Sequence, residues 1–244
     1  MAKVTKKASA AQAAKPGAWE QVEGFCTNMA SSTNMPMLKS WMNAYFHPAE
    51  AFASEKKNAS WGNIVVQVIL ITIITTVAGG LAGLISLATA PNVLGSAIGL
   101  PVLGMGLVAG AAAGFIGVFL VSLLYLIVAK LFKGAGSYTA QTLGLVLVSG
   151  GTTLLLAPLQ VLGAIPCLGV VFSLAGLVFG LYGIYSQYRM LKAVHNLSQT
   201  GAIGVMVISW VVIIVIVAVV ILIAGAALLG AMGLGAIANS MGSY

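Results

Sequence analysis

The side chains that most often carry out chemistry in proteins are scarce in this sequence. The acids are Glu20, Glu23, Glu50 and Glu55, aspartate is absent, and the two histidines are His47 and His195. A paired-carboxylate active site, a proton relay or a metal cluster needs several such groups close together. The sequence therefore predicts no catalytic residue, no cofactor and no metal site.

The remaining reactive side chains are isolated from one another along the chain. Cys26 and Cys167 are the only cysteines, too few for a disulfide framework or a metal knuckle. For Cys26 the alternatives are burial in an amphipathic helix and fatty acylation, and for Cys167 a packed thiol is expected. His195 is expected in a polar loop with Arg189 and Lys192. Neither a P-loop motif nor a strand-linked GxGxxG occurs, so nucleotide binding is not supported.

The elements that must carry these side chains are strongly apolar. Of the 244 residues, 60% are apolar and 6% are charged, whereas a soluble domain is about 45–50% apolar and about one quarter charged. Eleven basic and four acidic side chains cannot cover a water-soluble surface, so a lipid bilayer is the expected solvent. The formal charge of +7 does not indicate nucleic acid, because no basic stripe interleaves with aromatic residues.

Five stretches without charged residues are long enough to cross a bilayer. A helix needs about 20 mainly apolar residues to span a hydrocarbon core of about 30 Å. The sequence therefore predicts an all-α polytopic membrane protein with five transmembrane helices. The predicted spans are 63–88, 101–129, 140–165, 167–187 and 202–229, with a tight turn at Pro166 between the third and the fourth.

The basic residues predict how the spans are oriented. Lys and Arg in short loops stay on the cytoplasmic side of a membrane. With five spans, every basic residue falls on one side, which places the N-terminus in the cytoplasm and the C-terminus outside. These eleven residues are Lys3, Lys6, Lys7, Lys15, Lys39, Lys56, Lys57, Lys130, Lys133, Arg189 and Lys192.

The first 60 residues differ from the rest of the chain and form a cytoplasmic basic and amphipathic segment. Helical spacing predicts two amphipathic helices, and Pro48 can open a further short helix as its first-turn residue. Two alternatives have equal weight: the apolar faces lie in the membrane interface, with Trp41 and Tyr45 at headgroup depth, or they pack on the bundle or a partner. The two apolar sets are Trp19, Val22, Phe25, Cys26 and Met29, and Leu38, Trp41, Met42 and Tyr45.

Glycine is the expected means of helix association. In a membrane, helices associate through close packing of small residues. Small residues repeat every four positions at Gly106, Gly110 and Gly114 and again at Gly176 and Gly180. Packing within the chain is favoured over a dedicated homodimer seam.

The fifth span is expected to lie at the periphery of the bundle. Residues 205–223 are almost entirely Val and Ile with one Trp210. Bulky branched side chains all round suit lipid exposure, and a partner covering this helix is the alternative.

Three short motifs resemble one known family. They are Phe46-His47-Pro48 with Phe52 before Trp61, the segment Leu131-Phe132-Lys133-Gly134-Ala135-Gly136-Ser137-Tyr138-Thr139, and Val194-His195-Asn196-Leu197-Ser198. Together they resemble the YIP-domain family, the Ypt/Rab-interacting membrane proteins and their prokaryotic relatives, over residues 43–225. Lys133 and Asn196 stand where that family usually has glycine. The acidic cytoplasmic motif of the eukaryotic members is missing, which favours a prokaryotic cell membrane and puts Rab binding in doubt.

Gly134 and Gly136 are expected to supply positive backbone angles for a sharp cytoplasmic turn. Lys130 and Lys133 are expected to reach phosphate headgroups.

The expected function is that of a non-enzymatic membrane scaffold or accessory subunit that binds lipids and partner membrane proteins. Its parts are the segment 1–60, through which a partner is expected to be held, a five-helix domain at 61–229 and a short extracytoplasmic tail at 230–244. A homo-oligomer is a further expectation. The alternative is a channel or permease for a small neutral or anionic solute, lined by neutral polar side chains of the first and third spans. The residues expected to contact lipid or a partner are Trp19, Trp41, Tyr45, Lys56, Lys57, Lys130, Lys133, Arg189 and Lys192.

Overall fold

The computed structural model describes residues 17–33, 35–89 and 94–241, and every regular element in these ranges is a helix. Five helices are long and apolar enough to cross a membrane. This confirms the all-α polytopic membrane fold predicted from the sequence. The five are α4 (Trp61–Thr89), α5 (Leu94–Leu131), α6 (Tyr138–Gly163), α7 (Gly169–His195) and α8 (Gln199–Met241).

The observed helices run past most of the predicted span ends. A bilayer sets the minimum length of a span, and the helix continues until a residue stops it. Ser137 starts α6, since its hydroxyl accepts the backbone N–H of Ala140 at 3.2 Å. Asn196 ends α7 in the left-handed conformation, with φ 54°. The segment 230–244, expected as a tail, is helical up to Met241.

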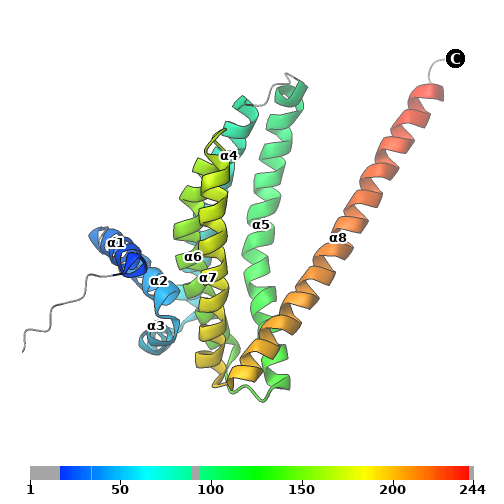
Figure 1. Ribbon diagram of the computed structural model, residues 1–244. Coiled ribbons are helices and arrows are strands. Elements are labelled where there is room, and N and C mark those ends of the chain that lie inside the picture. The colour runs from blue at the N-terminus through cyan, green and yellow to red at the C-terminus, as the bar shows by residue number, and fades with distance from the viewer. Residues whose placement is uncertain (1–16, 34, 90–93, 242–244) are drawn as a thin grey trace, which may run out of the picture.

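Helix α6 lies at the centre of the bundle and packs on α4, α5 and α7 (Figure 1). Helix α8 leaves this group at an angle and diverges from α5 toward the C-terminus. In the part of α8 up to Ile223, the buried side chains are confined to the first turns, at Ala202, Val205, Met206 and Ser209. The fifth span is therefore peripheral, as predicted.

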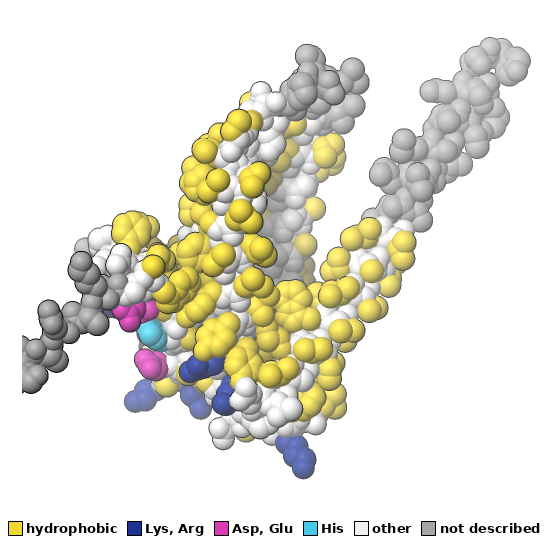
Figure 2. All heavy atoms as spheres, viewed as in Figure 1, with side chains coloured by type: hydrophobic (Ala, Val, Ile, Leu, Met, Phe, Trp, Pro, Cys, Tyr) yellow, Lys and Arg dark blue, Asp and Glu magenta, His cyan; other side chains and the backbone are white. Residues whose placement is uncertain are grey.

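The N-terminal segment forms three short helices on one flank of the bundle: α1 (Ala18–Ser32), α2 (Pro36–Phe46) and α3 (Pro48–Glu55). A 3-10 turn at Lys56–Asn58 leads into α4. Helix α2 packs on α6, and α3 packs on α7. The short helix opening at Pro48 is therefore confirmed. Figure 2 shows Lys and Arg side chains gathered toward one end of the bundle, below helices covered by hydrophobic side chains.

Candidate functional site

The contact between α2 and α6 is built on two adjacent glycines. The indole of Trp41 fills the space beside Gly150, and the backbone of Trp41 lies against Gly151. The Trp41 ring is fully buried, and its Nε1–H donates to Oε1 of Gln67 on α4 at 2.7 Å. Small residues let helices approach closely, so Gly150 and Gly151 admit α2 to the side of the bundle.

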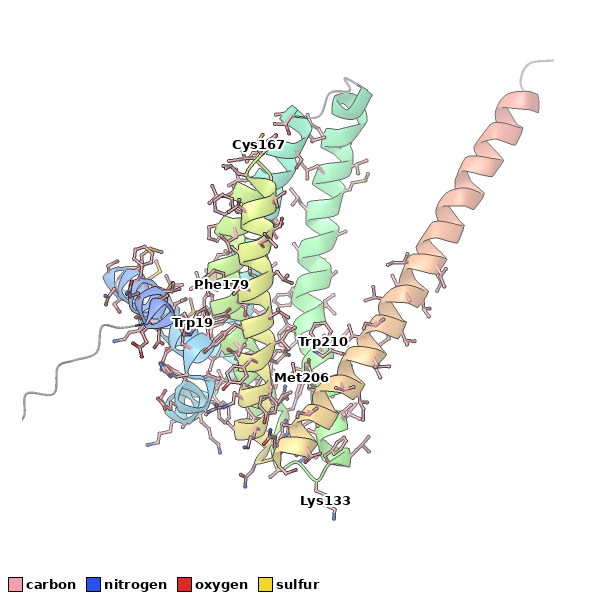
Figure 3. All side chains as sticks on the ribbon, in the orientation of Figure 1. Trp19, Lys133, Cys167, Phe179, Met206 and Trp210 are labelled. Carbon is pink, nitrogen blue, oxygen red and sulfur yellow. The ribbon has the colours of Figure 1, made fainter. Side chains whose placement is uncertain are left out.

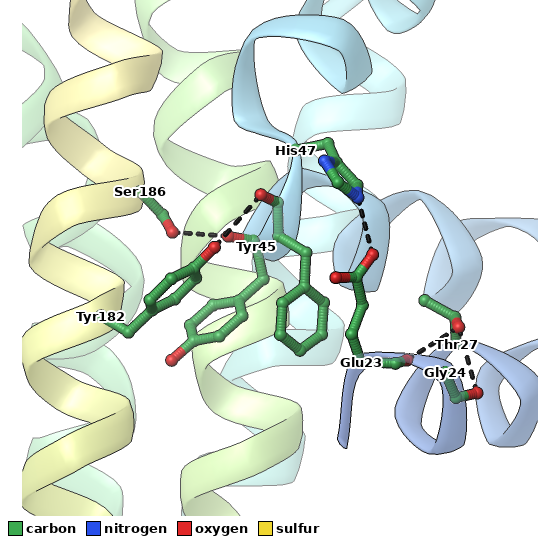
Figure 4. Close-up of polar contacts among 8 residues, drawn as sticks. Glu23, Gly24, Thr27, Tyr45, His47, Tyr182 and Ser186 are labelled. Atoms are coloured by element: carbon green, nitrogen blue, oxygen red, sulfur yellow. Dashed lines mark hydrogen bonds and ion pairs between the residues drawn. The ribbon is translucent and has the colours of Figure 1, made fainter. Parts of the chain in front are cut away.

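The end of α2 is fixed to α7 by three hydrogen bonds, two of which are drawn in Figure 4. The Ser186 hydroxyl donates to the backbone oxygen of Tyr45, and the Tyr182 hydroxyl donates to that of Phe46 at 3.2 Å. The Tyr45 hydroxyl donates to the backbone oxygen of Phe179. Helices α2 and α7 are thereby held in one relative position.

Trp41 and Tyr45 therefore do not contact lipid. Both side chains are fully buried in the protein. For these two residues, the alternative of a position in the membrane interface is wrong and the alternative of packing on the bundle is correct. The reason is that their hydrogen-bond partners lie on α4 and α7.

Some apolar residues of α1 pack on the bundle, and others are exposed on the surface of the protein. Trp19 packs on Tyr182, with ring centroids 4.7 Å apart, and lies next to Phe179 (Figure 3). Phe25 and Met29 point away and are 67% and 60% exposed. For these two residues, contact with the membrane interface stays a prediction.

The loops that follow α5 and α7 meet at His195. The His195 ring is buried, its Nδ1 accepts the backbone N–H of Gly136 at 3.2 Å, and its Nε2 lies 2.8 Å from Oε1 of Gln141. An acceptor at Nδ1 leaves the proton on Nε2, which donates to Gln141, so the ring is neutral. The backbone oxygen of His195 also accepts the N–H of Ala135. The expectation of a polar loop is wrong, because this ring joins the segment after α5 to the end of α7.

The sharp turns in these loops do not depend on glycine residues with a positive φ. No described glycine has a positive φ, whereas Lys133 and Asn196 have φ 61° and 54°. The expectation that Gly134 and Gly136 supply positive angles is wrong. They are needed for space, because a Cβ atom at either position would lie within 3.0 Å of His195 Nδ1.

A hollow of about 620 Å³ opens beside this junction, between α3, the end of α7 and the start of α8. Among the described residues, Arg189 and Lys192 are the charged residues that line it, and aromatic, amide and aliphatic side chains complete it. The guanidinium of Arg189 donates from Nη1 to the Tyr185 hydroxyl at 2.8 Å and lies 5.8 Å from the centre of that ring. The polar side chains that line it with them are Tyr185, Tyr188, Asn196 and Gln199.

A family model for the Yip1 domain matches residues 42–222. The chain belongs to the Yip1 family. The resemblance stated from the three motifs is confirmed, and the matched range contains both loops that meet at His195. No curated protein and no solved structure matches the chain.

The other predicted cationic residues are separate from this hollow. Lys56 and Lys57 are exposed in the turn before α4, and Lys130 and Lys133 are exposed at the end of α5 and in the loop after it. Lys133 and Cys167 lie at opposite ends of the Yip1 domain (Figure 3). Contact of the four lysines with lipid or a partner stays a prediction.

The glycines predicted for helix packing make no close contact with other helices of the Yip1 domain. A Cβ atom at Gly106, Gly110, Gly114, Gly176 or Gly180 would have no neighbour within 4 Å outside its own helix. Packing within the chain, the favoured alternative, is therefore not realised at these five positions. Glycines that do pack closely are elsewhere: Gly144 faces Met190, and Gly204 faces Phe132.

Metal binding has no support among the described residues, in which no group of three His, Cys, Asp or Glu side chains could hold an ion. One buried polar atom near the loop junction, Nε2 of Gln141, has no hydrogen-bond partner.

Proposed function

We propose that this integral membrane protein of the Yip1 family is a non-enzymatic scaffold or accessory subunit, which binds a transmembrane helix of another membrane protein. Its N-terminus is cytoplasmic and its C-terminus is outside, because all basic residues then face the cytoplasm. A prokaryotic cell membrane is the proposed location.

The observation that carries the proposal is a glycine face on α5 that the fold leaves unused. Gly106, Gly110 and Gly114 are exposed. In lipid, surfaces of small residues favour association because backbones can approach closely. A binding function explains why such a face has no partner within the chain.

The glycine face is continuous with an existing helix contact. Phe132, just after α5, packs against Gly204 of α8. Within α5 itself, Tyr125 interacts with Trp210 of α8. Gly114 precedes Tyr125 by 11 residues, about three turns of an α-helix, so the two residues lie on the same side of α5. The side of α5 that contacts α8 at its C-terminal end therefore has no helix packed on it at Gly106, Gly110 and Gly114, where α8 has diverged from α5 (Figure 1).

An apolar transmembrane helix fits this opening. On the α8 side, the side chains from Val211 to Ile223 are mostly exposed Val and Ile. A helix seated between α5 and α8 meets glycine on one side and branched side chains on the other. The contact between Phe132 and Gly204 would then extend toward the outer surface.

The transport alternative needs a continuous polar passage, and the local pairing of polar groups argues against it. Gln67 accepts from Trp41, Ser122 is bonded to Thr142, and Gln141 accepts from His195. The hydroxyls of Thr72 and Thr75 donate to carbonyls of their own helix. Neutral polar groups that satisfy one another support a packing role.

The cytoplasmic face contributes a second kind of contact. Lys56, Lys57, Lys130 and Lys133 are exposed and can reach anionic headgroups. The N-terminal segment also offers a surface for a partner, since Phe25 and Met29 on α1 remain uncovered.

A photo-crosslinking test decides whether the glycine face is occupied. A photoreactive phenylalanine analogue replaces Val102, one turn before Gly106, or Val108 on the opposite side of α5. Both positions are exposed. We expect a membrane-protein adduct at 102 that is lost in the Gly110→Leu variant, and none at 108.

An adduct with a second copy of this chain would identify the partner helix as its own. Equal adducts at both positions, or an adduct unaffected by Gly110→Leu, would contradict the proposal. Solute uptake by liposomes containing the purified protein, above that of empty liposomes, would favour the permease instead.

A further inference from the structure

One exposed face of α7 changes in character along its length. Leu174, Leu177 and Leu181 are 60%, 58% and 58% exposed. Tyr185 continues the same helical spacing, and Arg189 and Lys192 follow it. Residues three and four apart share one side of a helix, so an apolar ridge leads through an aromatic ring to two cations.

The cationic end of this face lies in the hollow beside His195, with Ala49 of α3 on its other side. Side chains on a helix lean toward its N-terminus, which for Arg189 is the direction of the apolar ridge. The bond to Tyr185 holds the guanidinium there. A positive group is therefore fixed at the end of an apolar surface.

The charges around the hollow favour an anion. Arg189 and Lys192 line it, and no carboxylate does among the described residues. Asn196 and Gln199 add neutral polar groups, and Gln199 begins α8, where the helix dipole is positive. One acid, Glu50, lines a separate and smaller hollow of about 150 Å³ to which Arg189 and Tyr185 also contribute.

We propose that this hollow binds the phosphate of an anionic phospholipid headgroup, with the acyl chains lying along Leu174, Leu177 and Leu181. Arginine forms paired hydrogen bonds with phosphate oxygens, and lysine adds a second positive charge. The exposed leucine ridge favours a lipid over a soluble phosphate. The inference deepens the lipid-binding part of the proposed function and does not depend on the glycine face of α5.

The test uses the full-length protein in a mild detergent and counts bound lipids by native mass spectrometry. The probes are dioctanoyl phosphatidylglycerol and dioctanoyl phosphatidylcholine, which differ in headgroup charge. We expect phosphatidylglycerol to bind about tenfold more tightly, and the double variant Arg189→Gln/Lys192→Gln to lose about tenfold in affinity for it.

The matched control is Lys39→Gln, which removes one charge from the exposed side of α2 outside the hollow and is compared with the single variant Lys192→Gln. Its affinity is expected to stay within about twofold of the unmodified protein. Arg189→Lys/Lys192→Arg keeps both charges and is expected to retain most of the binding. An equal loss for Lys39→Gln and Lys192→Gln would overturn the proposal, because a charge outside the hollow would then suffice.

Two further outcomes would overturn it without any variant. Equal binding of the two lipids by the unmodified protein would exclude a headgroup site for an anion. Displacement of phosphatidylglycerol by an equal concentration of glycerol 3-phosphate would show that the ligand is a soluble phosphate. The crosslinking experiment at position 102 tests the helix-binding proposal independently, so a negative result for lipid binding would not contradict that proposal.

Discussion

The backbone of Trp41 in α2 lies directly against Gly151 in α6, so that a Cβ atom at position 151 would overlap the Trp41 carbonyl oxygen. The Trp41 side chain is fixed at the same time by its bond to Gln67. The N-terminal segment can therefore pack against the side of the bundle because Gly151 of α6 has no side chain to keep α2 away.

Replacing Gly151 with alanine is expected to destabilise the protein. Alanine favours a helix by about 1 kcal/mol relative to glycine, but the added methyl group meets backbone, which cannot rotate away. Overpacking of this kind costs about 1–3 kcal/mol. The midpoint of thermal unfolding in detergent is expected to fall by several degrees.

Gly110→Ala is the matched control for that variant. Position 110 is also helical, but its Cβ would meet nothing within 4 Å outside its own helix. The thermal midpoint is expected to stay the same or to rise, because alanine can add up to about 1 kcal/mol to the free energy of unfolding. A lower midpoint for Gly110→Ala than for Gly151→Ala would refute the assignment of both glycines.

Replacing Lys133 with glycine is expected to stabilise the protein. Lys133 has φ 61°, and a left-handed conformation costs about 1–2 kcal/mol for most residues. Asn196 has φ 54°, but asparagine tolerates this conformation better. The gain in the free energy of unfolding is therefore expected to be larger for Lys133→Gly than for Asn196→Gly.

Lys130→Gly provides the control for the loop variants. Lys130 lies in the last turn of α5, where glycine is expected to cost about 1 kcal/mol. Stabilisation by all three glycine substitutions would mean that the backbone angles are not the cause.

The membrane spans could be predicted from the sequence because bilayer thickness sets their length directly. The location of α2 could not be predicted in this way. The spacing of Leu38, Trp41 and Tyr45 indicates an apolar face, but the same pattern suits lipid, the bundle or a partner. The pair Gly150 and Gly151 carried the missing information, since neighbouring glycines opposite a tryptophan permit close approach.

The role of His195 was missed for a related reason. A histidine among Arg189, Lys192 and loop residues has the composition of an exposed segment, and burial depends on a partner 54 positions away, Gln141. The signal available was that both loops belong to motifs of one family. The packing partner of the α5 glycines could not be predicted either. A repeat of small residues has the same sequence pattern whether the helix that packs on it belongs to this chain or to another protein.

His195→Ala is expected to destabilise the junction of the loops after α5 and α7 by about 2–4 kcal/mol. The change leaves a cavity and removes the acceptor for Gly136 and the donor to Gln141. Thermal unfolding and protease cleavage in the loop at 132–137 measure the effect. Both are expected to show a less stable protein.

The other histidine serves as the control. His47 is 46% exposed, and its Nε2 pairs with Glu23 at 2.7 Å on the surface. His47→Ala is expected to change stability by less than about 1 kcal/mol. If the two alanine variants behaved alike, the junction at His195 would not be a main contact of the fold.

The two cysteines test the proposed orientation of the chain. Cys167 is exposed at the turn between α6 and α7, and Cys26 is half-buried in α1. A membrane-impermeant maleimide is expected to label Cys167 in intact cells and to leave Cys26 unlabelled. Each single Cys→Ser variant identifies which thiol has reacted.

After the membrane is permeabilised, Cys26 is expected to react more slowly than Cys167. Burial raises the pKa of the Cys26 thiol, and the thiolate is the reactive form. A raised pKa lowers the thiolate fraction at neutral pH, so the Cys26 rate is expected to increase by up to about tenfold for each unit by which pH is raised, as long as pH stays below that pKa. Labelling of Cys26 in intact cells, with Cys167 protected until permeabilisation, would reverse the orientation and place the basic residues outside.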